Sequence, residues 1–221
     1  MYSKTQIPNG AELVDGVFHQ IIKSDTTDLR PVLFLDRDGC IVIETNYLHK
    51  VEEVQIINGA ANVIAQANSL NIAVVVVTNQ AGIGRGYFTW EDFFEVQQEI
   101  NSQLAKAGAH FDGVFACPFH EKGKQPYQHP NHPSRKPNPG MLDAAAVSLN
   151  LDLSRSWIVG DRTSDLGAGL NARLAGGIHV ASGHGSREGE RESSLALATD
   201  NYKVLTAKSI ANIPEMIDLF T

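Results

Sequence analysis

Short apolar runs alternate with longer stretches of helical periodicity along most of the chain. The apolar runs are too short for helices and predict buried strands of a parallel sheet. They lie at residues 32–35, 72–77, 113–116, 157–160 and 178–181. Helices are expected at residues 60–70, 90–106, 139–149, 166–174 and 209–220. Because predicted strands and helices alternate, the expected fold class is α/β with a doubly wound parallel sheet.

Four segments depart from this alternation. Residues 1–30 are mostly polar and predict an N-terminal arm on the outside of a domain that spans residues 31–221. Residues 40–48 favour a small hairpin, and residues 182–200 are polar, glycine-rich and expected to be mobile. Residues 117–137 hold several prolines and predict a long loop. Long loops in compact domains usually have a function, so this loop is a candidate part of a site.

The strand predicted at residues 32–35 ends in two carboxylates. Asp36 and Asp38 stand one residue apart, and Gly39 gives the chain the freedom to bend so that both face one pocket. In open α/β sheets, ligands bind at the carboxyl ends of the strands. Two carboxylates this close repel each other unless a cation or a shared proton lies between them, which indicates a metal ion. Taken alone, the pair also fits a capping aspartate and a turn aspartate after a core strand.

Polar residues follow several predicted strands or the loop after one of them. They are Asp36 and Asp38, Thr78 and Asn79, Arg135 and Lys136, and Asp161 with Asp165. A parallel sheet brings its strand ends to one edge, so these carboxylates, a hydroxyl and an amine are expected around one cavity. A phosphoryl group needs a cation, hydrogen-bond donors and a lysine, while a carboxylate can attack phosphorus. The set therefore predicts phosphoryl transfer.

Composition narrows the class of partner. The chain has 221 residues, enough for one domain with a real core, and a net charge of −7, which argues against nucleic-acid binding. Its longest aliphatic run, residues 72–77, is far too short for a membrane span. No apolar stretch near the N-terminus suits a signal peptide, and Cys40 and Cys117 are too few for a disulfide framework. We therefore expect a cytoplasmic monomer whose partner is a small molecule, with no nucleic acid and no membrane.

Several motifs carry a resemblance to a known family. Residues 36–39, Thr78-Asn79, Lys136-Pro137 and Gly160-Asp161 with Asp165 resemble the four motifs of the haloacid dehalogenase superfamily of phosphatases. Residues 77–88 and 135–142 are similar to its branch of heptose-bisphosphate and histidinol-phosphate phosphatases. The resemblance covers roughly residues 31–181. It implies a magnesium-dependent phosphomonoesterase with a Rossmann-like sheet, small loop insertions and no large cap domain.

The resemblance implies a role for each motif residue. Asp36 would be the nucleophile that forms an aspartyl-phosphate, and Asp38 would protonate the leaving oxygen and then activate water. Thr78 and Lys136 would hold the phosphoryl oxygens. The implied magnesium ligands are Asp36, the backbone carbonyl of Asp38, and Asp161, with Asp165 in support. The residues implied to bind the sugar or its second phosphate are Asn79, Arg85 and Arg135, although Arg85 also fits a solvated loop residue.

The sequence departs from the family pattern in two places. Cys40 stands where a threonine often follows the glycine. In the loop, the sugar-phosphatase branch often holds a structural zinc through a Cys-x-His and a Cys-x-Cys pair, whereas this chain has Phe119, His132 and Ser134 at three of those positions. A zinc site formed by Cys117, His120, His129 and His132 stays open, since zinc accepts mixed sulfur and nitrogen ligands. A metal-free loop is favoured, because two of the three departures in the loop replace a usual zinc ligand by a residue of another type.

The expected function is hydrolysis of a phosphate from a sugar bisphosphate, with the 7-phosphate of D-glycero-D-manno-heptose 1,7-bisphosphate as the leading candidate. Histidinol phosphate, or a broad range of small phosphomonoesters, is the alternative substrate. An inactive phosphate-binding scaffold is the alternative of another class. The presence of both Asp36 and Asp38 favours an enzyme, since a non-catalytic relative would be expected to lose one of them.

Overall fold

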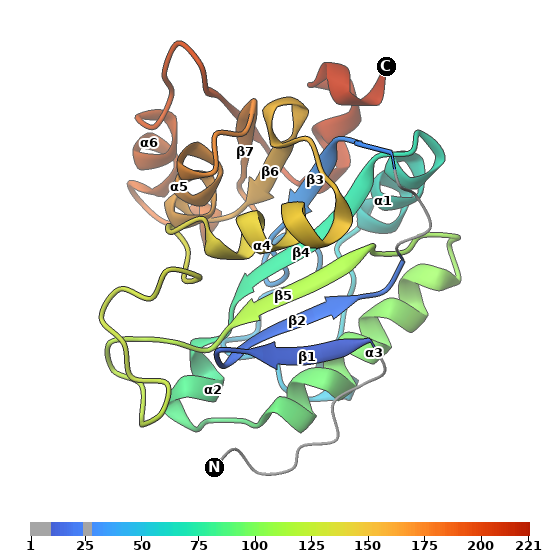
Figure 1. The fold of residues 1–221 in the computed structure, drawn as a ribbon. Coiled ribbons are helices and arrows are strands. Elements are labelled where there is room, and N and C mark those ends of the chain that lie inside the picture. The colour runs from blue at the N-terminus through green and yellow to red at the C-terminus, as the bar shows by residue number, and fades with distance from the viewer. Residues whose placement is uncertain (1–9, 24–27) are drawn as a thin grey trace.

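The computed structural model describes residues 10–23 and 28–221 (Figure 1). The described residues form an eight-stranded sheet with the strand order β1-β2-β5-β4-β3-β6-β7-β8. The strands are β1 (Ala11–Val14), β2 (Val17–Ile21), β3 (Val32–Leu35), β4 (Ala73–Asn79), β5 (Gly113–Cys117), β6 (Trp157–Gly160), β7 (Gly176–Val180) and β8 (Lys203–Ala207). Strands β3 to β8 are parallel to one another. The predicted α/β fold with a doubly wound parallel sheet is confirmed.

Helices cover both faces of this sheet. The α-helices are α1 (Ala60–Ser69), α2 (Ala81–Arg85), α3 (Trp90–Ala105), α4 (Gly140–Leu149), α5 (Thr163–Asn171) and α6 (Glu190–Leu195). The 3-10 helices are Val51–Glu53, Leu153–Arg155, Gly183–Ser186, Ile210–Glu215 and Asp218–Phe220. Figure 1 shows α4 and α5 on the face of the sheet turned towards the viewer. Within the described part of the chain, no helix combines the length and the apolar composition needed to cross a membrane.

Strand β3 is buried on both faces, which explains its unbroken apolar run. Leu33 and Leu35 belong to the apolar cluster formed with α1 and α3, while Val32 and Phe34 belong to the cluster formed with α4 and α5. All four side chains are fully buried. Side chains alternate between the two faces along a strand, so a strand between two helical layers must be apolar at every position. This packing fixes where the strand ends and therefore where Asp36 lies.

The N-terminal segment differs from the expected outside arm. Residues 11–21 form the hairpin of β1 and β2, and β2 pairs with β5 in antiparallel register. Val17 and Phe18 are buried in the two apolar clusters of the sheet. The hairpin thus extends the sheet, because it covers the edge of β5 that would otherwise be open to solvent. Residues 1–9 and 24–27 of the expected arm lie outside the described residues.

The other departures from the predicted elements lie after β3 and in the last forty residues. Residues 40–48 form isolated bridges, between Asp38 and Val42 and between Val42 and Ile56, in place of a hairpin. The segment of residues 182–200 contains a 3-10 turn and α6, and β8 follows it as a strand that was not predicted. The helix expected at residues 209–220 is replaced by two 3-10 helices. Pro214 lies inside the first of them and has no N–H for an α-helical hydrogen bond.

Candidate active site

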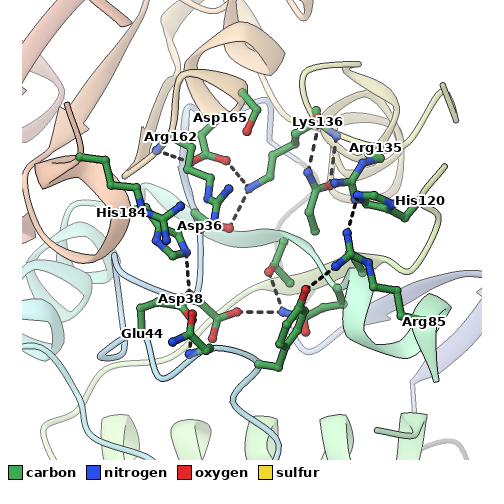
Figure 2. A pocket seen from close by; sticks show the side chains of 18 residues that line it. Asp36, Asp38, Glu44, Arg85, His120, Arg135, Lys136, Arg162, Asp165 and His184 are labelled. Atoms are coloured by element: carbon green, nitrogen blue, oxygen red, sulfur yellow. Dashed lines mark hydrogen bonds and ion pairs between the residues drawn. The ribbon is translucent and has the colours of Figure 1, made fainter. Parts of the chain in front are cut away.

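The candidate site lies at the carboxyl end of β3, where the strand order reverses. From β3 the chain adds β4 and β5 on one side, and it later returns to add β6 and β7 on the other. A reversal of this kind opens a crevice beyond the strand ends. A cavity of about 530 Å³ lies there. Figure 2 shows the 18 side chains that line it, most of them polar or charged.

Lys136 occupies the centre of the site. Its Nζ lies 2.7 Å from Asp36 Oδ1 and 2.7 Å from Asp165 Oδ1, and it donates to the Val77 carbonyl at 2.6 Å. All three ammonium protons therefore have an acceptor. The side chain is almost completely buried and points between the two carboxylates (Figure 2). Lys136 thus ties the end of the long loop to the end of β3 and to the start of α5.

Asp161 completes a buried group of carboxylates. Asp36, Asp161 and Asp165 each offer an oxygen, and these atoms lie within 4.8 Å of one another. Asp161 Oδ2 accepts from the His184 backbone N–H at 2.6 Å, whereas its Oδ1 is buried without a hydrogen-bond partner. A Cβ added to Gly39 would collide with the Asp161 carboxylate, and Gly39 has a φ of +83°. Glycine is therefore required at position 39 both for the turn after β3 and for this close approach.

The charges of this group are only partly balanced. Burial, opposed by Lys136 and reinforced by Asp165 and Asp38, raises the pKa of the Asp36 carboxyl to about 7. Burial and the repulsion of Asp36 and Asp165 raise the pKa of Asp161 to about 8. Burial by itself lowers the pKa of the Lys136 ammonium, but the adjacent Asp165 and Asp36 carboxylates outweigh it and raise that pKa. The group thus holds three carboxylates and one ammonium, which pairs with two of them.

This donor set fits a magnesium ion. Magnesium prefers oxygen ligands, and a divalent cation would relieve the repulsion among the three carboxylates. Asp161 Oδ1, buried and without a partner, is available as a ligand. The Asp38 carboxylate is outside the group of Asp36, Asp161 and Asp165. Any contribution of Asp38 to a metal site would therefore come from its backbone carbonyl, as the resemblance implies.

The Asp38 carboxylate faces the cavity and is held by hydrogen bonds. Arg37 Nε lies 3.2 Å from each of its two oxygens. Gln80 Nε2 donates to Asp38 Oδ2 at 2.9 Å and to Thr78 Oγ1 at 2.9 Å. Since Thr78 Oγ1 accepts this bond, its own proton is free for another acceptor. Asp38 and Thr78, predicted as separate parts of the site, are thus linked through Gln80.

Two of the predicted substrate residues, Asn79 and Arg135, line the cavity but also hold the loop in place. Asn79 Nδ2 donates to the Lys136 carbonyl at 3.1 Å, and the Lys136 N–H donates to Asn79 Oδ1 at 3.1 Å. Arg135 Nη1 donates to the Phe119 carbonyl at 3.0 Å. The Asn79 amide therefore fixes the backbone that presents Lys136.

Arg85, the third predicted substrate residue, lies at one wall of the cavity. Its Nη1 donates to Tyr47 Oη at 2.8 Å, and its Nη2 lies 3.0 Å from His120 Nε2 (Figure 2). Asn46 and Tyr47 have φ values of 57° and 70°. Two successive non-glycine residues in the left-handed region cost backbone energy and are found most often where a loop serves a site. The Arg85 guanidinium is thus held in position by Tyr47 and His120 and is not a freely solvated group.

Several lining residues were not predicted from the sequence. They are Glu44, Asn46, Tyr47, Gln80, Ala81, Arg162, Ser164, His184 and Arg187. Gln80 and Ala81 lie within the motif of residues 77–88, and Arg162 directly follows Asp161, so their sequence positions alone could have indicated them. His184 and Arg187 come from the segment expected to be mobile, where no motif marks them.

The structure does not gather the four candidate zinc ligands into one site. Among the described residues, only the carboxylate group of Asp36, Asp161 and Asp165 has three or more potential ligand atoms close enough for a metal. His132 instead stacks on Phe119, with ring centroids 3.9 Å apart and planes inclined by 1°. Burial raises the pKa of the Cys117 thiol to about 11, whereas zinc binds the thiolate. Two of the positions where the family often has zinc ligands are thus occupied by the stacked rings of Phe119 and His132.

We expect protein purified without added metal to hold far less than one zinc per chain. The reason is the distribution of Cys117, His120, His129 and His132, which lack a shared centre. Elemental analysis by mass spectrometry measures the ratio of zinc to protein, and the magnesium-containing buffer without protein is the control. A zinc-to-protein ratio near one would show that the loop rearranges around a metal.

Comparisons with known proteins agree with this geometry. A family model described as HAD-hydrolase-like matches residues 133–205. A D-glycero-beta-D-manno-heptose-1,7-bisphosphate 7-phosphatase of Mesorhizobium japonicum is 49% identical over 147 residues, which cover 66% of this chain and 68% of the relative. A D-glycero-alpha-D-manno-heptose-1,7-bisphosphate 7-phosphatase of Burkholderia mallei is 39% identical over 164 residues, 74% of this chain and 86% of the relative.

A solved structure extends the similarity to most of the chain. The D,D-heptose 1,7-bisphosphate phosphatase of B. bronchiseptica, complexed with magnesium and phosphate, has a TM-score of 0.69 and 26% identity. The match covers 84% of this chain and 96% of that chain. The fold and the relatives thus agree with the resemblance seen in the sequence. The chain belongs to the haloacid dehalogenase (HAD)-like hydrolase family, and it is a phosphatase.

Proposed function

We propose that the protein is a magnesium-dependent phosphomonoesterase that removes the 7-phosphate of D-glycero-D-manno-heptose 1,7-bisphosphate through an aspartyl-phosphate on Asp36. The ion pair of Lys136 and Asp36 carries this proposal, with 2.7 Å between Nζ and Oδ1 at the end of β3. A buried ammonium beside a carboxylate favours its ionised, nucleophilic form and is placed to contact a phosphoryl oxygen. The names of the two relatives support the substrate.

The first step transfers the phosphoryl group to Asp36. Because Oδ1 is held by Lys136, Asp36 Oδ2 is the oxygen that forms the bond to phosphorus. The bond between phosphorus and the sugar oxygen breaks, and its electron pair stays on the sugar oxygen. That oxygen takes the proton of the Asp38 carboxyl and leaves as an alcohol. The hydroxyl proton of Thr78, free because Oγ1 accepts from Gln80, is donated to a phosphoryl oxygen.

The second step releases inorganic phosphate. Asp38, now a carboxylate, takes a proton from a water molecule, whose oxygen forms a bond to phosphorus. The bond between phosphorus and Asp36 breaks, and its electron pair returns to the Asp36 carboxylate. Asp38 is left protonated and ready for the next cycle. One carboxyl group can serve both steps because it faces the cavity from a fixed position.

Asp36, Asp161 and the Asp38 carbonyl would hold magnesium, and Asp165 would act in support. When bound, magnesium supplies positive charge that offsets the repulsion between the carboxylates and the anionic substrate. Asp165 Oδ1 pairs with Lys136 at 2.7 Å, and its Oδ2 accepts from the Arg162 N–H at 3.0 Å. With both oxygens engaged in this way, Asp165 fixes Lys136 beside Asp36.

The charges along the cavity favour a substrate with a second anionic group. Four arginines line it: Arg85, Arg135, Arg162 and Arg187. A guanidinium pairs with phosphate oxygens through two parallel hydrogen bonds, so a bisphosphate gains contacts that a monophosphate lacks. Histidinol phosphate carries an ammonium group that these arginines would repel. The heptose bisphosphate is therefore preferred to histidinol phosphate.

We expect phosphate release with magnesium to be fastest for the heptose 1,7-bisphosphate, with kcat/KM at least about tenfold above histidinol phosphate. Both anomers belong in the assay, since the two relatives differ in the anomer that they are named for. Fructose 1,6-bisphosphate serves as a bisphosphate control. Equal rates on all substrates would indicate a broad phosphatase. Absence of phosphate release from every substrate would indicate the phosphate-binding scaffold.

A further inference from the structure

Arg37 lies between the two catalytic aspartates in sequence, yet it cannot touch substrate. Its side chain is the largest that is fully buried among the described residues, with a relative exposure of 0%. The guanidinium lies 5.0 Å from the centre of the Phe93 ring of α3, within the helical layer under the site. Any effect of Arg37 on the reaction must therefore act through a neighbour that does reach the cavity.

Stability alone does not explain a guanidinium at this position. Moving a charge of this kind out of water is costly, and replacing a buried ion pair by apolar side chains is often neutral or stabilising. Arg37 Nη1 is buried without a hydrogen-bond partner, and the bond of Nη2 to the Leu48 carbonyl is long at 3.5 Å. The short polar contacts of Arg37 are instead with Asp38, whose side chain has a relative exposure of 17%.

The contacts with Asp38 come from two directions. On the buried side, Arg37 Nε lies 3.2 Å from both carboxylate oxygens and Nη2 lies 3.1 Å from Oδ1. On the cavity side, Gln80 Nε2 donates to Oδ2 at 2.9 Å. A carboxylate with one contact can rotate about its terminal torsion, whereas donors on two sides fix the plane of the group.

We propose that Arg37 is a positioning residue that fixes the Asp38 carboxyl group for proton transfer, with Gln80 holding the same group from the cavity side. This inference rests on the proposed role of Asp38 as acid and base. Proton transfer requires the donor and acceptor oxygens within hydrogen-bond reach, and a displacement of about 1 Å can cost about a hundredfold in rate. Arg37 thus contributes to turnover without contributing to substrate binding.

Arg37→Met tests this role, because methionine fills much of the same volume and removes every donor. We expect kcat on a sugar phosphate that the wild type hydrolyses to fall about a hundredfold, with KM changed by less than about threefold. Arg37→Lys retains the charge without the fork and should recover part of kcat. Thermal unfolding of each variant checks that the fold is intact.

A second readout separates positioning from general damage. p-Nitrophenyl phosphate releases a phenolate that needs no proton, so phosphorylation of Asp36 should stay fast in Arg37→Met. Hydrolysis of the aspartyl-phosphate still needs Asp38 as a base and should slow down. Rapid mixing should then show a burst of p-nitrophenol close to one equivalent per enzyme in the variant, larger than in the wild type. A purely structural defect would lower the burst amplitude.

Gln80→Met is the second variant, since Gln80 lines the cavity and its exchange leaves the layer around Arg37 untouched. It should lower kcat by slowing hydrolysis of the aspartyl-phosphate, but it also removes the hydrogen bond to Thr78 Oγ1. Arg37→Lys, which loses the fork and keeps the charge, therefore decides the question if Arg37→Met does not fold. Wild-type kcat in the folded variants, or slowing of both steps without a burst, overturns the inference. Asp36→Asn is measured in parallel. An active Asp36→Asn enzyme overturns the proposed mechanism and this inference together. If Asp36→Asn is inactive and Arg37→Met keeps the kcat of the wild type, the inference alone is overturned.

Discussion

Asp36→Asn is expected to lower turnover by about 10⁴-fold or more, because an amide cannot attack phosphorus and no other step replaces the covalent one. The protein should remain folded. Asparagine is close to aspartate in size, and the exchange removes one of three buried carboxylates while Asp165 still pairs with Lys136 at 2.7 Å. Phosphate release under steady-state conditions measures the rate, and thermal unfolding checks the fold.

Asp38→Asn is the matched control for this result. It makes the same exchange two residues away but leaves the nucleophile, so phospho-enzyme should still form from p-nitrophenyl phosphate and accumulate. Acid quenching followed by mass spectrometry would detect a mass increase on the peptide that contains Asp36. Turnover by Asp36→Asn within about a hundredfold of the wild type would remove Asp36 from the role of nucleophile.

The sequence predicted the centre of the fold and of the site because both depend on local patterns. The run Val32–Leu35 is apolar at every position because helices cover both faces of β3, and this same run fixes where Asp36 emerges. Lys136 is distant from Asp36 in sequence, yet it was placed beside it, since parallel strands end at one edge of the sheet. The strand ends were therefore sufficient to bring the carboxylates together, and the lysine follows from the loop after β5, which ends at the same edge of the sheet.

The remaining wall of the cavity depends on contacts that no short pattern encodes. His184 reaches the site because Asp161 Oδ2 accepts its backbone N–H at 2.6 Å, an interaction that is independent of the side chain at position 184. The segment that carries it is anchored through α6, where Glu190 Oε1 accepts from the Thr163 N–H at 2.5 Å. A polar, glycine-rich composition does not distinguish such an anchored segment from a mobile one.

The hairpin of β1 and β2 was missed for a related reason. Its two strands are short, and Val17 and Phe18 are the only residues of those strands that are buried, so the alternation of apolar and polar residues is weak. The hairpin becomes part of the sheet because β2 pairs with the edge of β5. Sequence patterns report which residues prefer burial, but they do not report which open edge is available to a short strand.

Removal of magnesium is expected to abolish activity while the protein stays folded. The carboxylates of Asp36 and Asp161 have pKa values raised to about 7 and about 8 in the metal-free protein, mainly by burial. A carboxyl whose pKa is higher in the folded than in the unfolded chain binds more protons when folded. Its contribution to stability is therefore present below its ordinary value of 3.8 and is lost as the pH rises through about 7 and about 8. The metal-free protein should lose stability over this range.

Magnesium should reverse that trend, because it binds the deprotonated carboxylates and replaces the protons that stabilise them at low pH. The increase in unfolding temperature caused by excess magnesium should thus be small near pH 6 and larger at pH 8.5. Calcium, which is larger and tolerates irregular coordination, should also raise the unfolding temperature. Phosphate release measured with calcium in place of magnesium then separates metal binding from catalysis. Asp161→Asn is the matched variant, since it removes the carboxylate whose Oδ1 has no partner in the protein and should weaken the shift at every pH. Full activity after dialysis against excess chelator, or a magnesium-induced shift that is independent of pH, would place the metal elsewhere than among these carboxylates.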